Sequence, residues 1–219
     1  MLFEEATARL AVLPARMPDP PPQLNPVLLG PEGPGGSAPA SVDARIPWPP
    51  GARRRAAALI LLYPGPAGEA FLVLIRRPAD DTRHAGEVAL PAGEIEADDA
   101  SPAAAALREA AEEVGLDPVQ AGVRVLGELG LVEIRASGFE LTPVLALAER
   151  EPELAADPRE VAALHAVPLR HFTAGAPIEM VEEEHRGLRL RYGAYPADGL
   201  NVWGATARVL GQLGALLGP

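Results

Sequence analysis

Acidic side chains gather in one short stretch of this sequence, residues 93–116, with the sequence GEIEADDASPAAAALREAAEEVGL. Against a single base, Arg108, it carries seven carboxylates: Glu94, Glu96, Asp98, Asp99, Glu109, Glu112 and Glu113. Like charges at such spacing repel one another, so this density of negative charge favours a bound cation. Hard divalent cations such as Mg²⁺ prefer oxygen ligands and leave coordination positions for water and substrate phosphate. The stretch therefore predicts a metal site.

Three residues predict where a helix in this stretch begins and ends. Ser101 is a typical N-cap, Pro102 suits the first helical position because it lacks an N–H, and Gly115 suits the C-terminal end. Apolar residues recur between them at helical spacing and predict a buried stripe. They are Ala103, Leu107, Ala110 and Val114.

Three glutamates of this helix, Glu109, Glu112 and Glu113, are separated by one, three and four positions. We expect them to share one face within a turn. One interpretation is a metal-binding face. The alternative is a solvated acidic face, in which Arg108 pairs with Glu112 four positions later.

Residues 108–116, REAAEEVGL, resemble the second half of the Nudix box, G-x5-E-x7-R-E-U-x-E-E-x-G-U, in which U is aliphatic. Every fixed position of that half is met, and residues 92–96, AGEIE, resemble the opening loop of the box. The interval before Arg108 is one residue longer than in the standard box. Only Asp98 or Asp99 therefore matches its first acid.

The resemblance to the Nudix family implies a set of roles. Glu109 and Glu113 would hold Mg²⁺ or Mn²⁺, and the backbone carbonyl of Ala92 would complete a metal position. Glu112 would assist as a ligand or orient the attacking water. Arg108 would fix the glutamates by ion pairing. Glu112, Glu113 and Arg108 are thus the expected catalytic residues.

A second resemblance covers residues 73–93, VLIRRPADDTRHAGEVALPAG. The segment is similar to the one that precedes the box in the coenzyme A pyrophosphatase branch of the family, L-L-T-x-R-S-x-x-L-R-x-H-x-G-x-V-[SA]-F-P-G-G. The matching positions are Arg77, His84, Gly86, Val88, Ala89, Pro91 and Gly93; the departures include Pro78, Asp81, Thr82, Leu90 and Ala92. Three later strings, SGFELTPVLAL, DPREVAALHAVPL and WGATAR, are also similar to this branch.

Cationic side chains in this segment fit such a substrate. Coenzyme A carries a diphosphate and a separate ribose phosphate, so its site needs cationic donors besides metal. Arginine makes bidentate contacts with phosphate, and histidine adds charge or a hydrogen bond. The expected substrate-binding residues are Arg76, Arg77, Arg83 and His84. For Arg76 and Arg83, the alternative is a solvated loop paired with Asp80 and Asp81.

Composition limits the other classes of function. The 219 residues carry a formal net charge of −11, which argues against nonspecific binding to nucleic acid or to an anionic membrane. The absence of cysteine excludes disulfides, thiolate catalysis and cysteine zinc sites. The N-terminus lacks the features of a signal peptide, so a cytoplasmic setting is expected. Dimers are common in relatives of this kind, and the sequence leaves a homodimer open.

The chain is expected to fold as one domain that follows an arm. Residues 1–52 are predicted to hold a short helix over 2–13 and a proline-rich arm, with a flexible tip around residues 31–41. Residues 53–219 would form the Nudix domain. The expected strands are Ala56–Tyr63 with Phe71–Ile75, Val123–Arg135 with Gly138–Leu147, and a hairpin within Ile178–Tyr195. A short helix after Asp157 and a last helix after Trp203 complete an α/β fold, the Nudix-type α/β/α sandwich with a mixed β-sheet.

The expected function is metal-dependent hydrolysis of the diphosphate bond of coenzyme A or acyl-coenzyme A, with no nucleic acid or membrane partner. The resemblance leaves the general base open among Glu112, Glu87 and Glu160. One alternative is an ADP-ribose or dinucleotide pyrophosphatase that uses the same box. Another is a Nudix-like module that binds a nucleotide without cleaving it.

Overall fold

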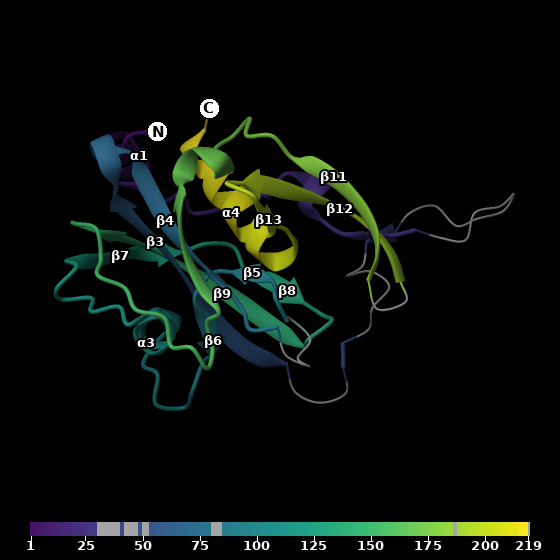
Figure 1. Cartoon of the computed structure of the whole chain (residues 1–219), viewed down its shortest axis with the longest axis horizontal. Coiled ribbons are helices and arrows are strands. Elements are labelled where there is room, and N and C mark those ends of the chain that lie inside the picture. The colour runs from purple at the N-terminus through teal and green to yellow at the C-terminus, as the bar shows by residue number, and fades with distance from the viewer. Residues whose placement is uncertain (30–39, 42–47, 50–52, 80–84, 186–187, 219) are drawn as a thin grey trace, which may run out of the picture.

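The computed structural model describes residues 1–29, 40–41, 48–49, 53–79, 85–185 and 188–218, which form two β-sheets with helices packed against them (Figure 1). The helices in these ranges are α1 (Phe3–Arg9), α3 (Pro102–Val114) and α4 (Gly204–Leu217). Short 3-10 turns lie at Pro22–Leu24, Pro66–Gly68 and Leu169–Phe172.

The larger sheet is built around β3 (Arg54–Pro64), which runs parallel to β9 (Phe139–Ala148) and antiparallel to β4 (Ala70–Arg76). Its order is β10-β4-β3-β9-β7, with β5 paired to β4, β6 to β3 and β8 to β9. The other strands of this sheet are β5 (Val88–Ala89), β6 (Ala92–Glu94), β7 (Val123–Glu128), β8 (Val132–Ile134) and β10 (Ala163–Pro168). The predicted hairpin of β3 and β4 is confirmed, and the sheet is mixed.

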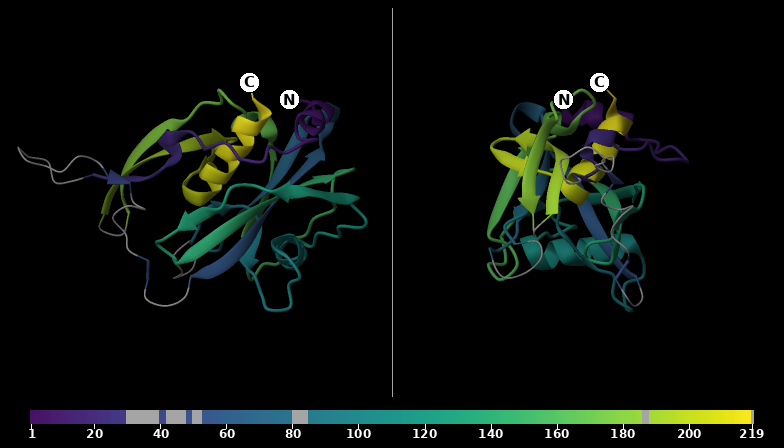
Figure 2. Two further views of the ribbon diagram at one scale, coloured as in Figure 1. Left: turned by 180° about the vertical axis from the view of Figure 1, so that it is seen from behind. Right: turned by 90° about the vertical axis from the view of Figure 1, so that its right-hand side faces the viewer.

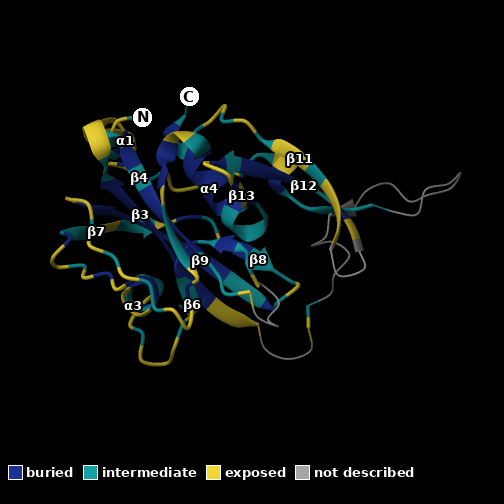
Figure 3. Cartoon of the chain, viewed as in Figure 1, coloured by how far each residue is buried: buried dark blue, intermediate teal, exposed yellow. Residues whose placement is uncertain are grey.

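Strand β3 is apolar on both faces because both faces are covered. Ile60 and Leu62 belong to the core that includes residues of α4, whereas Leu59 and Leu61 belong to the core that includes residues of α3. The two helices therefore lie on opposite sides of the sheet (Figures 1 and 2), and buried residues concentrate on the strands between them (Figure 3). This is the predicted α/β sandwich.

A smaller sheet lies beside α4, with the order β11-β12-β1-β2 and β13 paired to β12. Its strands are β1 (Val27–Leu28), β2 (Ala40–Ser41), β11 (Glu179–His185), β12 (Leu188–Ala197) and β13 (Leu200–Val202). The predicted hairpin within Ile178–Tyr195 is confirmed as β11 and β12, and its turn at 186–187 lies outside the described residues. Tyr195 faces the core with α4, and Tyr192 faces the opposite side of this sheet.

The N-terminal segment is packed onto the rest of the chain. Leu10 and Leu24 are fully buried, and β1 pairs with β12. The division of the chain at residue 52 stays a prediction, and the predicted tip at 31–41 lies almost entirely outside the described residues. No helix in the described ranges is long and apolar enough to cross a membrane.

Two predicted elements have other bounds than expected. The N-terminal helix predicted over 2–13 ends at Arg9, and Leu10 turns into the core. The strand predicted over Val123–Arg135 is divided into β7 and β8. The reason is that Gly130, between them, exchanges hydrogen bonds with the buried side chain of Gln212 on α4, at 2.9 and 3.2 Å, instead of with a strand.

The short helix predicted after Asp157 is wrong. The Asp157 carboxylate accepts the backbone N–H of Arg159 at 2.9 Å, which closes a turn, and the chain then enters β10 at Ala163. Strand β10 pairs along its whole length with Phe71–Arg76 of β4. Tertiary pairing has therefore overridden the local helix signal.

Candidate functional site

Helix α3 begins and ends as predicted. Ser101 Oγ accepts the backbone N–H of Ala104 at 3.1 Å, and Gly115 closes the helix with a φ of 66°. Its buried apolar residues are Ala105, Ala106, Ala110 and Val114, while Ala103 and Leu107 of the predicted stripe are partly buried.

A distant loop fixes the C-terminal end of the same helix. The backbone N–H groups of Ala155 and Asp157 donate to the carbonyls of Val114 and Glu113, both at 2.9 Å. These carbonyls lie in the last turn, where no intrahelical partner is available. The loop that leads to Glu160 is therefore attached directly to α3.

Strand β6 lies against two glutamates of α3. The backbone N–H of Ala92 donates to Glu113 Oε2 at 2.9 Å. Gly93 lies so close to Glu109 that an added Cβ would come within 2.0 Å of the carboxylate carbon. The missing side chain at Gly93 therefore gives the Glu109 carboxylate its place beside the backbone.

Backbone alternation also directs the Ala92 carbonyl away from β3. The carbonyl of the preceding residue, Pro91, accepts the N–H of Leu59 at 2.9 Å. In an antiparallel ladder, residues bonded to the partner strand alternate with residues whose N–H and C=O both point outward. Ala92 is of the second kind, and its N–H reaches Glu113. Its carbonyl points out on the same side of β6.

Burial changes the acidity of these two carboxylates. Glu113 is only 3% exposed, and burial raises its pKa to about 7, although a backbone hydrogen bond and the charge of Arg77 oppose the rise. Burial also raises the pKa of Glu109, against the ion pair with Arg108. The charges of Glu109 and Glu160 add to the rise at Glu113. A cation beside these groups would stabilise their charged forms.

Arg108 lies at the centre of an ion-pair network. Its Nη2 and Nε donate to the two oxygens of Asp99 at 3.0 and 3.2 Å. Its Nη1 donates to Glu109 at 2.8 Å and to Glu112 at 3.0 Å, and Nη2 also donates to the carbonyl of Glu94 at 3.0 Å. The hydrogen bond to Asp99 is the main cause that raises the pKa of Arg108 and lowers that of Asp99. The guanidinium thus ties β6, the following loop and α3 together.

The sequence left the first acid of the box open between Asp98 and Asp99, and the structure selects Asp99 as the partner of Arg108. The Asp99 side chain is 7% exposed and also accepts the backbone N–H of Glu96 at 2.8 Å. Asp98 is exposed. The signal that could have found this residue is the turn itself, because an aspartate commonly accepts a nearby backbone N–H.

Glu109 and Glu113 are the side chains that best fit a divalent cation. No group of three His, Asp or Glu side chains within the described ranges is close enough to hold an ion. Two carboxylates and the Ala92 carbonyl nevertheless suit Mg²⁺, which usually keeps several waters and binds through one or two carboxylates together with substrate phosphate. Glu112 is 57% exposed and pairs with Arg108, so it lies at the solvent edge of this cluster.

The two described arginines of the predicted substrate segment point to different sides. Arg76 pairs across the strands with the core residue Val88, and its Nη1 donates to the carbonyl of Gly86 at 3.1 Å. The charge of Arg77 acts directly on Glu113. Because side chains alternate along a strand, Arg76 lies on the α4 side and Arg77 on the α3 side. The predicted Arg83 and His84 lie outside the described residues.

The two other acids considered for the general base lie near the site in different ways. Glu160 is exposed, and its negative charge raises the pKa of both Glu109 and Glu113. Glu87 accepts the backbone N–H of Arg77 at 3.0 Å through its carbonyl.

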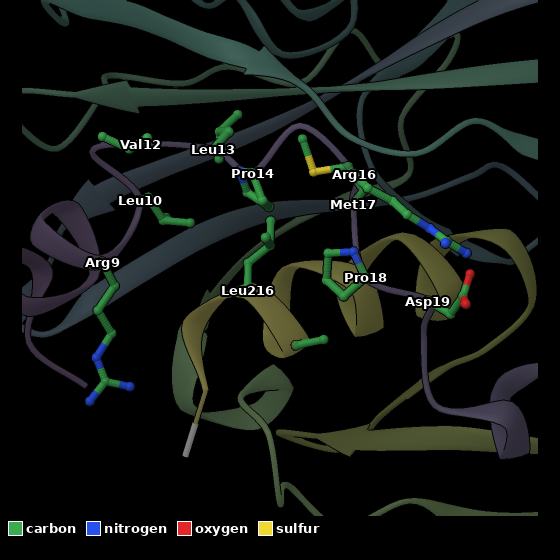
Figure 4. A pocket seen from close by; sticks show the side chains of 11 residues that line it. Arg9, Leu10, Val12, Leu13, Pro14, Arg16, Met17, Pro18, Asp19 and Leu216 are labelled. Atoms are coloured by element: carbon green, nitrogen blue, oxygen red, sulfur yellow. The ribbon is translucent and has the colours of Figure 1, made fainter.

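A separate pocket of about 470 Å³ lies elsewhere, between residues 9–19 and α4 (Figure 4). Its apolar wall includes Leu10, Leu13, Met17 and Leu216, and none of the glutamates of α3 lines it. It is therefore not part of the site on α3 and β6.

Comparisons with known proteins show which family this chain resembles. Residues 52–189 match the NUDIX domain family model. A protein of Cronobacter sakazakii described as an uncharacterized Nudix hydrolase, NudL, is 35% identical over 166 residues, which cover 76% of this chain and 84% of that protein. The NudL protein of Pectobacterium atrosepticum is 37% identical over 166 residues, which cover 74% and 81%. The crystal structure of the Nudix hydrolase RenU from M. smegmatis aligns at a TM-score of 0.45 and 26% identity, over 65% of this chain and 79% of that one.

Proposed function

This chain belongs to the Nudix family, and we propose that its site on α3 and β6 hydrolyses the diphosphate bond of coenzyme A or acyl-coenzyme A. As a Nudix hydrolase, it acts on pyrophosphate bonds. From coenzyme A, the products would be adenosine 3′,5′-bisphosphate and phosphopantetheine.

The observation that carries the proposal is the position of Arg77 at the end of β4 on the α3 side of the sheet, where its charge lowers the pKa of buried Glu113. Arg77 belongs to the segment that resembles the coenzyme A branch, and its charge acts on the carboxylate that faces Ala92. A diphosphate held by a guanidinium at this point would lie next to the acidic cluster. Arginine suits this role because its fixed fork of donors matches phosphate oxygens.

Each residue of the cluster then has a physical task. Glu109 and Glu113, with the Ala92 carbonyl, would hold Mg²⁺ or Mn²⁺, which when bound supplies polarisation of the diphosphate and a lower pKa for the attacking water. Arg108 donates hydrogen bonds to Glu109 on α3 and to Asp99 in the loop before α3, and in this way it fixes the position of Glu109. Arg77 would orient the phosphate and offset its charge.

The proton acceptor is proposed among the acids around this cluster. Glu112 is exposed beside Arg108, and Glu160 is exposed on the loop attached to α3, so both lie where a water could reach them. Glu87 is the third candidate, next to Arg77. Single substitutions to glutamine, compared by their pH–rate profiles, would identify the base as the variant that loses the acidic limb.

A substrate panel tests the proposed function. Initial rates with Mg²⁺ or Mn²⁺ would be compared for coenzyme A, acyl-coenzyme A, ADP-ribose and NADH. The proposal requires the highest kcat/KM for coenzyme A or its acyl derivative. A preference for ADP-ribose or NADH would instead establish the alternative pyrophosphatase. Nucleotide binding without turnover of any of the four would establish a binding module.

A substitution tests the metal assignment separately. Glu113→Gln keeps the size of the side chain but removes its charge, so we expect kcat to fall by at least about 100-fold, in line with losses of single electrostatic groups in active sites. Equal activity of the variant and the wild type would refute the assignment.

A cytoplasmic location and a homodimer stay predictions. Light scattering would decide whether the chain forms a homodimer.

A further inference from the structure

Two aromatic rings of the smaller sheet lie beside the predicted substrate segment. Tyr192 of β12 and Trp203, which follows β13, stack with their ring centroids 4.5 Å apart and an interplanar angle of 26°. Tyr192 is 1% exposed, whereas Trp203 is only half-buried. The phenol of Tyr192 therefore covers one face of the indole, on the side of the smaller sheet away from the core with α4, and the Trp203 residue keeps part of its surface accessible.

Contacts between segments connect this pair to the glutamates of α3. Strand β13 lies against β5, which begins one residue after Glu87. The Glu87 carbonyl accepts the N–H of Arg77, and the charge of Arg77 acts on Glu113. At the other end, the negative charge of Glu87 reaches Tyr192. A ligand with its diphosphate at Arg77 thus has the aromatic pair on one side.

The charges around the rings decide which part of a ligand fits there. The Tyr192 hydroxyl is hydrogen bonded to Glu183 and Asn201, and Glu87 adds a second negative charge nearby. Two carboxylates would repel a phosphate, which favours an uncharged group at this point. Carboxylate and amide oxygens accept hydrogen bonds, so a planar ring with N–H donors is favoured over an aliphatic chain.

We propose that Trp203, supported by Tyr192, is the platform on which the purine base of the nucleotide substrate stacks. Every base has a π-face, and stacking on an aromatic side chain is a common means of holding it. The phosphates then extend toward Arg77 and the carboxylates of α3. This inference rests on the proposed function, because it assigns one part of the same substrate, but binding alone tests it.

Fluorescence gives a direct test, because the chain has two tryptophans. Trp48 stacks with Arg53 and is not part of the site on α3, so Trp48→Phe leaves Trp203 as the sole indole. This variant of the full chain would be titrated with AMP and, as a matched ligand without a base, with ribose 5-phosphate. We expect AMP to quench the fluorescence of Trp203 and ribose 5-phosphate to leave it unchanged. Binding of AMP in calorimetry without a change in fluorescence would overturn the proposal.

Substitutions of Trp203 separate stacking from a role in folding. In calorimetry, Trp203→Leu should weaken AMP binding by about 5- to 150-fold, the range that corresponds to loss of one stacked base, and Trp203→Phe should recover most of it. The affinity for ribose 5-phosphate should be the same in all three proteins. Equal losses for both ligands would show a structural role and refute the platform. Wild-type affinity of Trp203→Leu for AMP would refute it as well.

The outcome is independent of the hydrolysis assay. If AMP quenches Trp203 but none of the four panel substrates is cleaved, the proposed function fails and the platform stands. If coenzyme A is cleaved but Trp203→Leu binds AMP as the wild type does, the function stands and the platform fails. Absence of AMP binding by the wild-type chain would also refute the platform.

Discussion

Gly93 offers the sharpest test of how the glutamates of α3 are positioned. Replacing it by alanine adds a single carbon that would lie 2.0 Å from the Glu109 Cδ and 2.1 and 2.3 Å from its two oxygens. Gly93 is not among the residues with positive φ, so alanine fits the backbone conformation. The added Cβ therefore acts mainly on Glu109, which has to move.

The size of that movement sets the expected effect. Real Cβ atoms come no closer than about 3 Å to another heavy atom. The added Cβ would lie 2.0 Å from the Glu109 Cδ, so the carboxylate has to move away by about 1 Å. A misplacement of about 1 Å in a catalytic site can lower the rate by about 100-fold. We expect Gly93→Ala to lose about that factor in kcat/KM, measured as initial rates with Mg²⁺ or Mn²⁺, while its circular dichroism stays that of the wild type.

A second glycine provides the matched control. A Cβ at Gly65, in the turn between β3 and β4, would come within 2.3 Å of the Phe71 ring, and its φ of −101° also accepts alanine. Gly65→Ala introduces a similar clash away from the glutamates, so its kcat/KM should stay within a few-fold of the wild type. Full activity of a folded Gly93→Ala protein would refute the proposed role of Glu109. An equal loss in Gly65→Ala would show that the clash acts through general destabilisation.

Three further predictions concern the network, the acidity and the end of the helix. Asp99→Asn should lower kcat/KM by about 10-fold or more, because Arg108 loses its charged partner. Asp98→Asn should leave kcat/KM unchanged. Steady-state kinetics of the two variants would decide, and equal values of kcat/KM would contradict the assignment of Asp99. In metal-free protein, the free energy of unfolding should fall by about 3 kcal/mol as pH rises from 4.5 to 7, because folded Glu113, with its pKa of about 7, binds a proton that the unfolded chain has released. Urea unfolding in the presence of a chelator should show this slope, and Glu113→Gln should remove it; a slope that persists in the variant would assign it to other groups. Gly115→Ala should lower the free energy of unfolding by about 1 kcal/mol, because alanine is strained at a φ of 66°. The new Cβ would also lie 3.2 Å from a backbone carbonyl oxygen, and this contact should lower the stability further. Gly68→Ala, with a φ of 73° and open space around it, measures the backbone term alone, and the prediction fails if the two variants are equally stable.

Helix α3 could be predicted because its signals are local. Ser101, Pro102 and Gly115 define the ends of α3, and the groups that they contact lie within five residues along the chain. The choice between Asp98 and Asp99 required the loop conformation, since the deciding contact is the ion pair with Arg108 nine residues away. Spacing alone gives the order of residues along a loop but not the direction in which each side chain points.

Two of the wrong predictions involve distant partners. The turn at Asp157 resembles a helix start, and only the pairing of β10 with β4 makes a strand of Ala163–Pro168. Likewise, the break before β8 depends on Gln212, which lies 82 residues after Gly130. A local pattern predicts the preference of a segment, and tertiary contacts worth more than that preference decide the outcome.

The separation of Arg76 and Arg77 shows what strand geometry adds to a motif. The sequence grouped both as substrate ligands, yet alternation along β4 places Arg76 with the core on the α4 side and leaves Arg77 toward Glu113. Leu74 faces the core with α4, and Ile75 faces the core with α3. Continuing this alternation by two residues would have predicted the sides on which Arg76 and Arg77 lie. Two adjacent arginines at the end of a strand therefore place one guanidinium on each face of the sheet.

In the proposed function, chemistry and specificity come from different parts of this fold, and this difference has a consequence for substrate choice. The carboxylates and the backbone that faces them come from residues 92–113, one loop and one helix whose positions are tied by Arg108. The residues proposed to surround the rest of a substrate are Arg77, Glu87 and Trp203, which follows β13 of the smaller sheet. A change in the smaller sheet can alter which nucleotide is bound without disturbing the network around Arg108. Substitutions at Trp203 should accordingly change KM between substrates with different bases, and substitutions at Asp99 should lower kcat for all of them alike.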